Sequence, residues 1–279
     1  MRDRALTRDL EWGIRVPLTG YEDKKIYIWA ENVLGYLSAS KLVCEERGES
    51  FEELWGPDSL HYYVHGKDNI PFHTIILPAL LIAHPEKWHL PDQIISSEYL
   101  TLEGRKISTS QNYAVWVSDI LQRYDPDSLR YYLLANGPEK KDSDFSFCEF
   151  INSHNGELLG AYGNFINRTL VFCQKYQDGI VPQGTFTNEL RERIQLLYDK
   201  TAEQIEAGEI KDALDEIFVA VRDANKLYDT QQPWITRTQE PELCSQTIHD
   251  CIQLAANFAV LLAPFLPFSS KKVCEWFSL

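Results

Sequence analysis

The chain has 279 residues, of which 44% are hydrophobic and 12% aromatic, enough for one large domain or two of ordinary size. No apolar run approaches the roughly 18 residues that indicate a membrane span, and residues 1–20 lack a secretory signal pattern. We therefore expect no membrane association. The net charge of −14 argues against nonspecific coating of nucleic acid, but a local basic patch could still contact RNA.

The cysteines are scattered and form no C-x-x-C pair. This argues against a disulfide framework and against a zinc site, and it favours a reducing, cytoplasmic setting. The six positions are Cys44, Cys148, Cys173, Cys244, Cys251 and Cys274.

In the first half, extended segments alternate with helical patterns. Apolar and β-branched runs predict strands at 26–29, 61–65 and 93–102. Helices are expected from about residue 32 to Gly48 and from Pro71 to about residue 83, with a kink at Pro78. This order predicts a parallel sheet with crossover helices. About three strands make only half of an ordinary doubly wound sheet, which leaves an open edge and an uncovered face.

In the second half, apolar residues recur at intervals of three and four, which predicts an antiparallel helical bundle. The helical segments are 147–177, 187–206, 209–229 and 243–264. A charged stretch at 138–146 separates the two patterns. We therefore predict an α/β domain at 1–144 and an all-α domain at 145–279.

A polar loop at 103–112 combines a glycine, two adjacent cations and several hydroxyls between the third extended segment and a helical pattern at 114–121. A flexible backbone, a lysine and a helix N-terminus together favour an anionic ligand. The alternative is a solvated hairpin or connection whose Ser and Thr side chains merely cap the helix.

Other candidate groups follow the predicted strands. Trp29 and Tyr36 could line a small apolar pocket, Asp68 could accept hydrogen bonds from a ribose, and His73 could orient a polar ligand. The competing interpretation is ordinary core packing with a satisfied, partly buried histidine.

A third candidate group lies in the helical half. Asn164 and Arg168 are four residues apart and so share one helix face, and Trp234 follows a Gln-Gln-Pro turn. An Asn, an Arg and an aromatic ring suit the reading of unstacked bases. A surface Asn–Arg pair with a Trp packed between helices would look the same in sequence.

Nearly the whole chain resembles the C-terminal part of the methionyl-tRNA synthetases, a class I synthetase family. The resemblance rests on motifs that occur in the family's order at 7–13, 27–29 with 35–40, 66–73, 104–110, 125–133, 163–168 and 232–234. It implies a Rossmann-like half-sheet, a connecting segment and a helical anticodon-binding domain.

The resemblance also implies a reaction and its site residues. The segment K-I-S-T-S at 106–110 is similar to the family's K-M-S-K-S loop, which holds the ATP phosphates while methionine is activated and then transferred to methionine tRNA. Magnesium accompanies the phosphates, and catalysis is by positioning and charge stabilisation. The implied residues are Lys106, Ser108 and Ser110 for catalysis, Gly66, Asp68, Lys106 and Ile107 for ATP, Trp29, Tyr36, Asn69 and His73 for methionine, and Asn164, Arg168 and Trp234 for the CAU anticodon.

Three departures from the family qualify these roles. Thr109 replaces the loop's second lysine, Asn32-Val33 stands where the family commonly has A-P, and the chain contains neither an H-I-G-H-like segment nor a four-cysteine zinc knuckle. We therefore expect a synthetase polypeptide that lacks the family's N-terminal half and is not active alone. The alternatives are a non-catalytic tRNA-binding module, one half of a split synthetase completed by a separate N-terminal chain, and an inert truncation.

Overall fold

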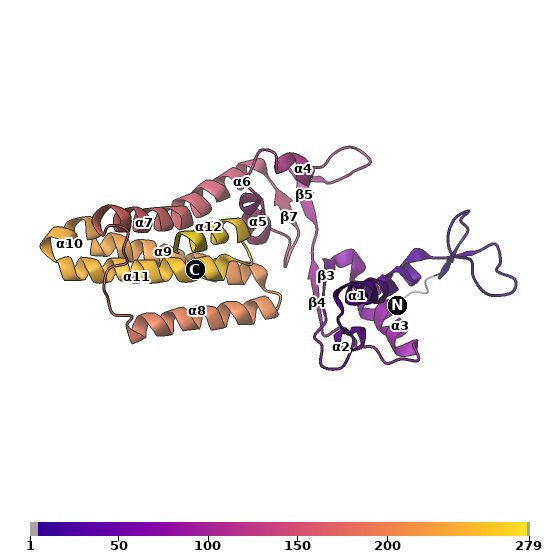
Figure 1. Ribbon diagram of the computed structural model, residues 1–279. Coiled ribbons are helices and arrows are strands. Elements are labelled where there is room, and N and C mark those ends of the chain that lie inside the picture. Colours follow the sequence, from indigo (N-terminus) through magenta and orange to yellow (C-terminus); the bar gives the residue numbers. More distant parts are fainter. Residues whose placement is uncertain (1–4, 278–279) are drawn as a thin grey trace. The chain divides into compact units, whose positions relative to one another are not determined.

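The computed structural model describes residues 5–277 and divides the chain into two compact units, Met1–Glu98 and Tyr99–Leu279. Figure 1 shows few and short strands in the first unit and long helices in the second. No helix in the described part of the chain is both long enough and apolar enough to cross a membrane. The expected division at residue 144 remains a prediction.

The centre of the first unit is a parallel pair of strands, β3 (Tyr62–Gly66) and β4 (Gln93–Ser97). A π-helix, η4 (Phe72–Ile76), and α3 (Leu77–Ala83) connect them. Pro78 lies in the first turn of α3, which follows the π-helix directly. The kink expected at Pro78 remains a prediction.

The two faces of this sheet differ in burial. Tyr63 and Ile94 pack with the buried Leu77 and Leu81 of α3. The opposite face bears Val64, which is 73% exposed, and Tyr62, which is 43% exposed. The uncovered face expected from the small number of strands is therefore present.

The strand expected at 26–29 is wrong. Only Lys25–Ile26 (β2) is extended, paired with Thr7–Arg8 (β1), and Ile28–Ala30 forms a 3₁₀ turn, η1. Ile28 is 56% exposed, so the apolar run that suggested a buried strand is not buried. The remaining helices of this unit are η2 (Asn32–Leu34), α1 (Gly35–Arg47), α2 (Phe51–Leu54) and η3 (Lys67–Asn69).

Gly48 ends α1 as expected. Its φ of 68° lies in the left-handed region, where glycine avoids the strain that a Cβ would bring.

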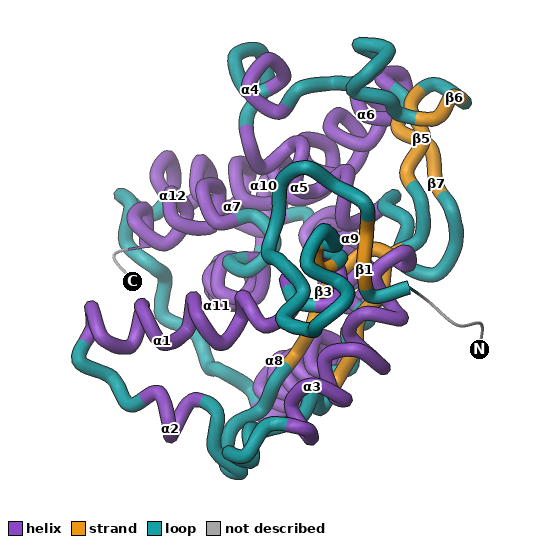
Figure 2. Tube along the Cα trace, turned by 90° about the vertical axis from the view of Figure 1, so that its right-hand side faces the viewer, coloured by secondary structure: helices purple, strands orange, loops and turns teal. Residues whose placement is uncertain are grey.

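The second unit contains a three-stranded sheet of β5 (Leu100–Leu102), β6 (Arg105–Lys106) and β7 (Ser143–Phe145). β5 pairs antiparallel with β6 and parallel with β7, and the three strands lie side by side in Figure 2. The extended segment expected at 93–102 is thus two strands in different sheets. The charged stretch at 138–146 contains β7, which the sequence did not indicate because only Phe145 of that strand is buried.

Helices make up the rest of this unit, and the four long helical segments expected from the sequence are present within a few residues of their predicted ends. The helix expected at 114–121 is shorter, because α4 begins only at Val117. The helices are α4 (Val117–Ile120), α5 (Pro126–Ala135), α6 (Phe147–Ser153), the π-helix η5 (His154–Gly163), α7 (Asn164–Tyr176), α8 (Asn188–Glu206), α9 (Ile210–Gln231), α10 (Pro233–Gln239), α11 (Pro241–Leu262) and α12 (Pro267–Phe277).

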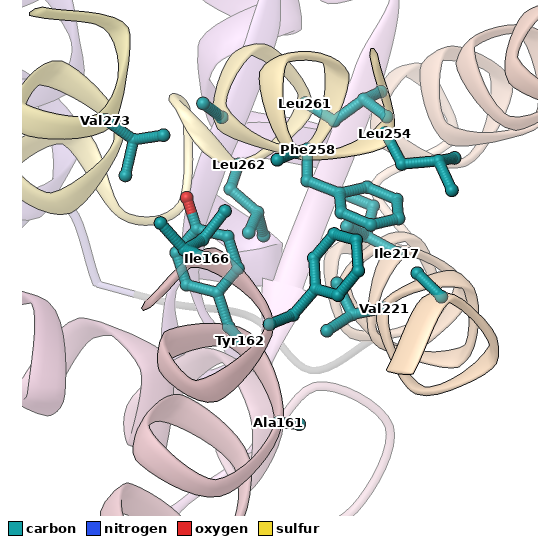
Figure 3. Close-up of a cluster of buried hydrophobic side chains, with 14 of the residues drawn as sticks. Ala161, Tyr162, Ile166, Ile217, Val221, Leu254, Phe258, Leu261, Leu262 and Val273 are labelled. Atoms are coloured by element: carbon teal, nitrogen blue, oxygen red, sulfur yellow. The ribbon is translucent and has the colours of Figure 1, made fainter. Parts of the chain in front are cut away.

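The core of the second unit lies between α7, α9 and α11. Phe165 and Phe258 meet edge to face with ring centroids 5.8 Å apart, and both are almost fully buried. Ile217, Val221 and Leu262 belong to the same buried cluster as this pair, and Figure 3 shows them around Phe258. Burial of such large side chains is the main stabilising contribution to a helical unit of this size.

Truncation of this core tests the packing. We expect Phe165→Ala to lower the free energy of unfolding by about 3–5 kcal/mol, because it leaves a cavity between α7 and α11. Val171→Ala on the exposed side of the same helix should change it by less than about 0.5 kcal/mol. Urea denaturation monitored by circular dichroism measures both free energies. Equal midpoints for the two variants would contradict the placement of Phe165 in the core.

Candidate functional site

In the first unit, three of the predicted site residues meet at His73, which is buried in η4. Its Nδ1 lies 2.9 Å from the backbone oxygen of Asn69, and its Nε2 lies 2.9 Å from the hydroxyl of Tyr36. Because a carbonyl can only accept, Nδ1 carries a proton and donates a hydrogen bond to the backbone oxygen of Asn69. These two contacts fix the imidazole in one orientation.

Aromatic rings surround this histidine. Trp29 stacks on Phe72 with centroids 4.7 Å apart, and His65 stacks on His73 at 4.3 Å. Tyr63 meets the ring of Tyr36 at 5.3 Å, and burial raises the pKa of Tyr63 to about 12, so its phenol stays neutral. Phe72, His65 and Tyr63 were not among the residues predicted from the sequence. The alternation along β3, which places Tyr63 and His65 on one face, could have found two of them.

Trp29 is placed differently from the expectation. It lies in a 3₁₀ turn and not at the carboxyl end of a sheet strand. Gly66 and Asp68 lie at the carboxyl end of β3 as expected. Gly66 is the last residue of the strand, and Asp68 is in the adjoining turn η3. A Cβ added to Gly66 would meet no atom within 4 Å, so open space lies beside this glycine.

In the second unit, the polar loop is a β-hairpin. Glu103 and Gly104 both have positive φ, at 47° and 74°, as a tight turn between β5 and β6 requires. The expectation that the loop adjoins a helix N-terminus is wrong, because α4 begins only at Val117 and the hairpin continues to a bridge between Ser108 and Tyr113. The loop therefore has no helix dipole to contribute.

The chemical groups of the loop remain accessible. Lys106 is exposed in β6, and within residues 5–277 its ammonium forms no ion pair. The hydroxyl oxygens of Ser108 and Ser110 lie 3.2 Å apart, and Ile107 is 37% exposed. A free cation beside two hydroxyls can bind an anionic group without help from a helix.

Two carboxylates hold the hairpin turn. Asp144 of β7 accepts hydrogen bonds at one oxygen from the backbone N–H of Gly104, at 2.8 Å, and from the Thr101 hydroxyl, at 2.5 Å. Glu103 accepts one from the N–H of Phe147 at the start of α6, at 2.8 Å. Asp144 lies 40 residues from Gly104 in sequence, so local patterns could not reveal this contact.

The helical half places Asn164 and Arg168 on one face of α7, as predicted, and both contact α9. Arg168 donates to the Asp229 carboxylate at 2.7 Å and to the backbone oxygen of Asn225 at 2.5 Å. The amide of Asn164 donates to the Asn225 side-chain oxygen at 3.3 Å. These bonds fix the guanidinium in one place.

An aromatic pair continues this cluster. The guanidinium carbon of Arg168 lies 4.2 Å from the centre of the Tyr228 ring, and the ring of Trp234 lies 6.1 Å from Tyr228. Burial raises the pKa of Tyr228 to about 12. Trp234 is 46% exposed, so it is not packed between helices, and one part of its indole ring is available to a ligand.

The turn before Trp234 is strained. Gln232 has a φ of 45°, a left-handed conformation that ends α9, and Pro233 then opens α10. This change of direction brings Trp234 back beside Tyr228. Three partners on α9 were not predicted from the sequence: Asn225, Tyr228 and Asp229. Tyr228 and Asp229 lie three and four residues after Asn225, shortly before the Gln-Pro-Trp turn, and this helical spacing is a signal that the sequence does contain.

Two family models match the chain. Residues 1–170 match the family model described as tRNA synthetases class I (M), and residues 181–279 match the one described as the anticodon binding domain of methionyl tRNA ligase. The chain belongs to the class I (M) tRNA synthetases.

Among the relatives of this synthetase chain, a methionine–tRNA ligase of Bacillus cereus (strain G9842) is 57% identical over 279 residues, which are 100% of this chain and 51% of the relative. One of Bacillus mycoides (strain KBAB4) is 56% identical over 273 residues, 98% of this chain and 50% of the relative. The chain thus spans about half the length of the curated relatives it matches.

A solved structure is similar to most of the synthetase chain. Mycobacterium tuberculosis methionyl-tRNA synthetase bound by methionyl-adenylate superimposes with a TM-score of 0.83 at 25% identity. The match covers 98% of this chain and 54% of the other. The combination of a Rossmann-type part and a helical part is therefore shared with the family's solved structures.

The contact between Asp144 and the hairpin can be tested in the isolated chain. We expect Asp144→Ala to speed hydrogen exchange of the Gly104 amide about tenfold, since that N–H loses a charged acceptor. Asp144→Asn keeps an acceptor oxygen and should retain most of the protection. Unchanged Gly104 exchange in Asp144→Ala, measured by mass spectrometry or NMR, would contradict the contact.

Proposed function

We propose that this chain is part of a methionine–tRNA ligase, which activates methionine with ATP and transfers it to methionine tRNA. Family membership supports this, as do Bacillus relatives that bear this name. We assign residues 1–144 to the catalytic part and 145–279 to an antiparallel helical bundle that binds the anticodon. The observation that carries the proposal is the Arg168 cluster beside the half-exposed Trp234.

Methionine is assigned to the group around His73. The rings of Trp29 and Tyr36 suit a thioether side chain, which packs favourably against aromatic rings. His73 and the Asn69 segment hold the Tyr36 hydroxyl in a fixed direction through the hydrogen bonds described above.

ATP is assigned to two groups. Asp68 would accept hydrogen bonds from the ribose hydroxyls, beside the open space at Gly66. Lys106, with the Ile107 backbone and the hydroxyls of Ser108 and Ser110, would bind the phosphates and stabilise the charge that develops on them. The carboxylates of Asp144 and Glu103 keep the hairpin in place for this role.

Magnesium would add charge neutralisation on the phosphates. The residues 5–277 contain no group of three or more His, Cys, Asp or Glu side chains that could hold a metal ion. Magnesium commonly binds to a nucleotide's own phosphate oxygens. The contribution of the chain is then the positioning of substrates and the cation of Lys106.

The anticodon is assigned to the face between α7, α9 and α10. The exposed part of Trp234 can stack on one unpaired base, while Asn164 and Arg168 offer donors to base edges. Asp229 and Tyr228 preorganise the guanidinium of Arg168, so little side-chain entropy is lost on binding.

One observation favours a second candidate, a role as one half of a two-chain synthetase. The face of β3 and β4 that bears Val64 and Tyr62 is apolar and uncovered. A partner polypeptide that covers this face would bury its exposed side chains. A strand of the partner that pairs with the edge of β3 or β4 would extend the sheet. Without such a partner, the helical half would still serve as a tRNA-binding module.

Binding of tRNA tests the anticodon assignment with the chain alone. We expect Trp234→Ala to weaken binding of methionine tRNA by about 1–3 kcal/mol, the usual contribution of one base stacked on an aromatic ring. Binding of a tRNA with another anticodon should change little. Equal losses for every tRNA in a filter-binding assay would overturn the assignment, and Trp276→Ala serves as a control at another exposed Trp.

Methionine-dependent ATP–pyrophosphate exchange tests the catalytic assignment. It is measured for the chain alone and after addition of the part of the Bacillus cereus relative that the chain does not match. Where exchange occurs, Lys106→Ala should lower kcat about 100-fold with little change in the KM for methionine, because its contact acts on the phosphates. Unchanged kcat would remove Lys106 from the phosphate site.

A further inference from the structure

A row of aromatic rings leads from Trp234 between α7 and α9 to a second exposed ring. The Trp234 ring lies 6.1 Å from Tyr228, Tyr228 lies 6.5 Å from Phe172, and Phe172 lies 4.8 Å from Tyr176. The two inner rings are buried, whereas the ends of the row, Trp234 and Tyr176, are partly exposed. The far end of the row is thus a second accessible ring on the same side of the bundle.

Two cations lie against this second ring. The guanidinium carbon of Arg237 is 4.4 Å from the centre of the Tyr176 ring, and the ammonium of Lys175 is 5.1 Å from it. Arg237 is three residues after Trp234 on α10, so the two side chains project from neighbouring positions of one helix. The contact of Arg237 with Tyr176 therefore connects α10 to the C-terminal end of α7, and Figure 1 shows both helices at the same end of the second unit.

These two cations differ from the others of the helical half in their ion pairing. Other cations of the helical half form ion pairs, such as Arg193 with Asp223 and Lys200 with Glu216. Arg168 itself pairs with Asp229. Across residues 5–277, neither Arg237 nor Lys175 forms an ion pair, although both are exposed.

This difference matters because the chain carries a net charge of −14. Such a protein repels a polyanion unless local positive charge lies where the polyanion binds. In the proposed anticodon site, the charge of Arg168 is already neutralised by Asp229, which suits the reading of bases but adds little attraction for phosphates. Arg237 and Lys175 supply that attraction beside the site.

We propose that Arg237 and Lys175 bind the backbone phosphate of a nucleotide that flanks the anticodon, and that Tyr176 is a positioning residue that holds both cations. The inference rests on the proposed function, because the ligand is the single-stranded loop whose bases reach Trp234. The cation–π contacts keep the two long side chains in place, so they bind the phosphate with a smaller loss of entropy. A phosphate contact adds affinity without reading the base.

The test uses the complete chain and a fluorescently labelled RNA stem-loop with the anticodon arm of methionine tRNA, carrying either CAU or GAU in the loop. Fluorescence anisotropy gives the affinity for each loop over a range of salt concentrations. We expect Arg237→Gln to weaken binding of both loops by the same factor, about three- to tenfold. The slope of log K against log salt should become shallower by about 0.7, the value for one lost phosphate contact on a single strand.

Two further variants separate the roles of the residues. Tyr176→Ala should weaken both loops in the same direction, and Tyr176→Phe should restore wild-type affinity because a benzene ring still holds the cations. Arg191→Gln is the matched control, since Arg191 is an exposed arginine that lies 4.9 Å from another ring, that of Phe186 near the start of α8. Its removal should change neither the affinity nor the slope, and circular dichroism confirms that each variant is folded.

The outcomes distinguish this inference from the proposed function. If the wild-type chain prefers CAU and Arg237→Gln changes neither affinity nor slope, the phosphate contact is overturned while the anticodon assignment stands. If the wild type binds both loops equally and Arg237→Gln still reduces the slope, the phosphate contact stands and the base-reading assignment fails. A wild type that binds neither loop overturns both.

Discussion

The packing of α7 on α9 is the constraint on which the candidate RNA surface depends. Its apolar part, with Phe165 and Val221, sets the separation of the two helices. At that separation, the guanidinium of Arg168 reaches both Asp229 and the face of Tyr228. A shift of one turn between the helices would break these contacts together. The polar cluster at the surface is thus a consequence of apolar packing below it, and its hydrogen bonds add direction more than stability.

Carboxylates that accept backbone N–H groups have a similar role in the small sheet. Lys106 is on a hairpin whose strands are only two and three residues long, which is too short for stability by strand pairing alone. Asp144 and Glu103 connect its turn to β7 and to the first residue of α6. The backbone of the hairpin is therefore held in place, whereas the exposed side chain of Lys106 can still change its conformation when a ligand binds.

The sequence predicted the helical half well and the strands less well, for a physical reason. A helix of 19 or 22 residues repeats its apolar pattern many times, so α8, α9 and α11 were found nearly to their ends. Strands of two or three residues carry almost no pattern. The run at 26–29 was misread because Ile28 and Trp29 suit a strand, although in the structure they belong to a 3₁₀ turn that follows β2.

The candidate site divides in the same way. Asn164, Arg168 and Trp234 could be named from motif and spacing, whereas Asp229, Tyr228 and Asp144 act through contacts between distant segments. Such contacts depend on how the helices and strands pack against one another, and no local pattern in a single sequence shows that packing.

The uncovered face of β3 and β4 has a consequence for handling the chain. Among residues 5–277 both strands lie in a two-stranded sheet, so each has one edge beside which no further strand pairs, and Val64 next to these edges is exposed. An apolar face beside a free edge is a template for strand addition by another copy. Self-association of the purified chain should therefore grow with concentration and begin in the first unit. A charged residue at position 64 would be the direct way to obtain a monodisperse sample.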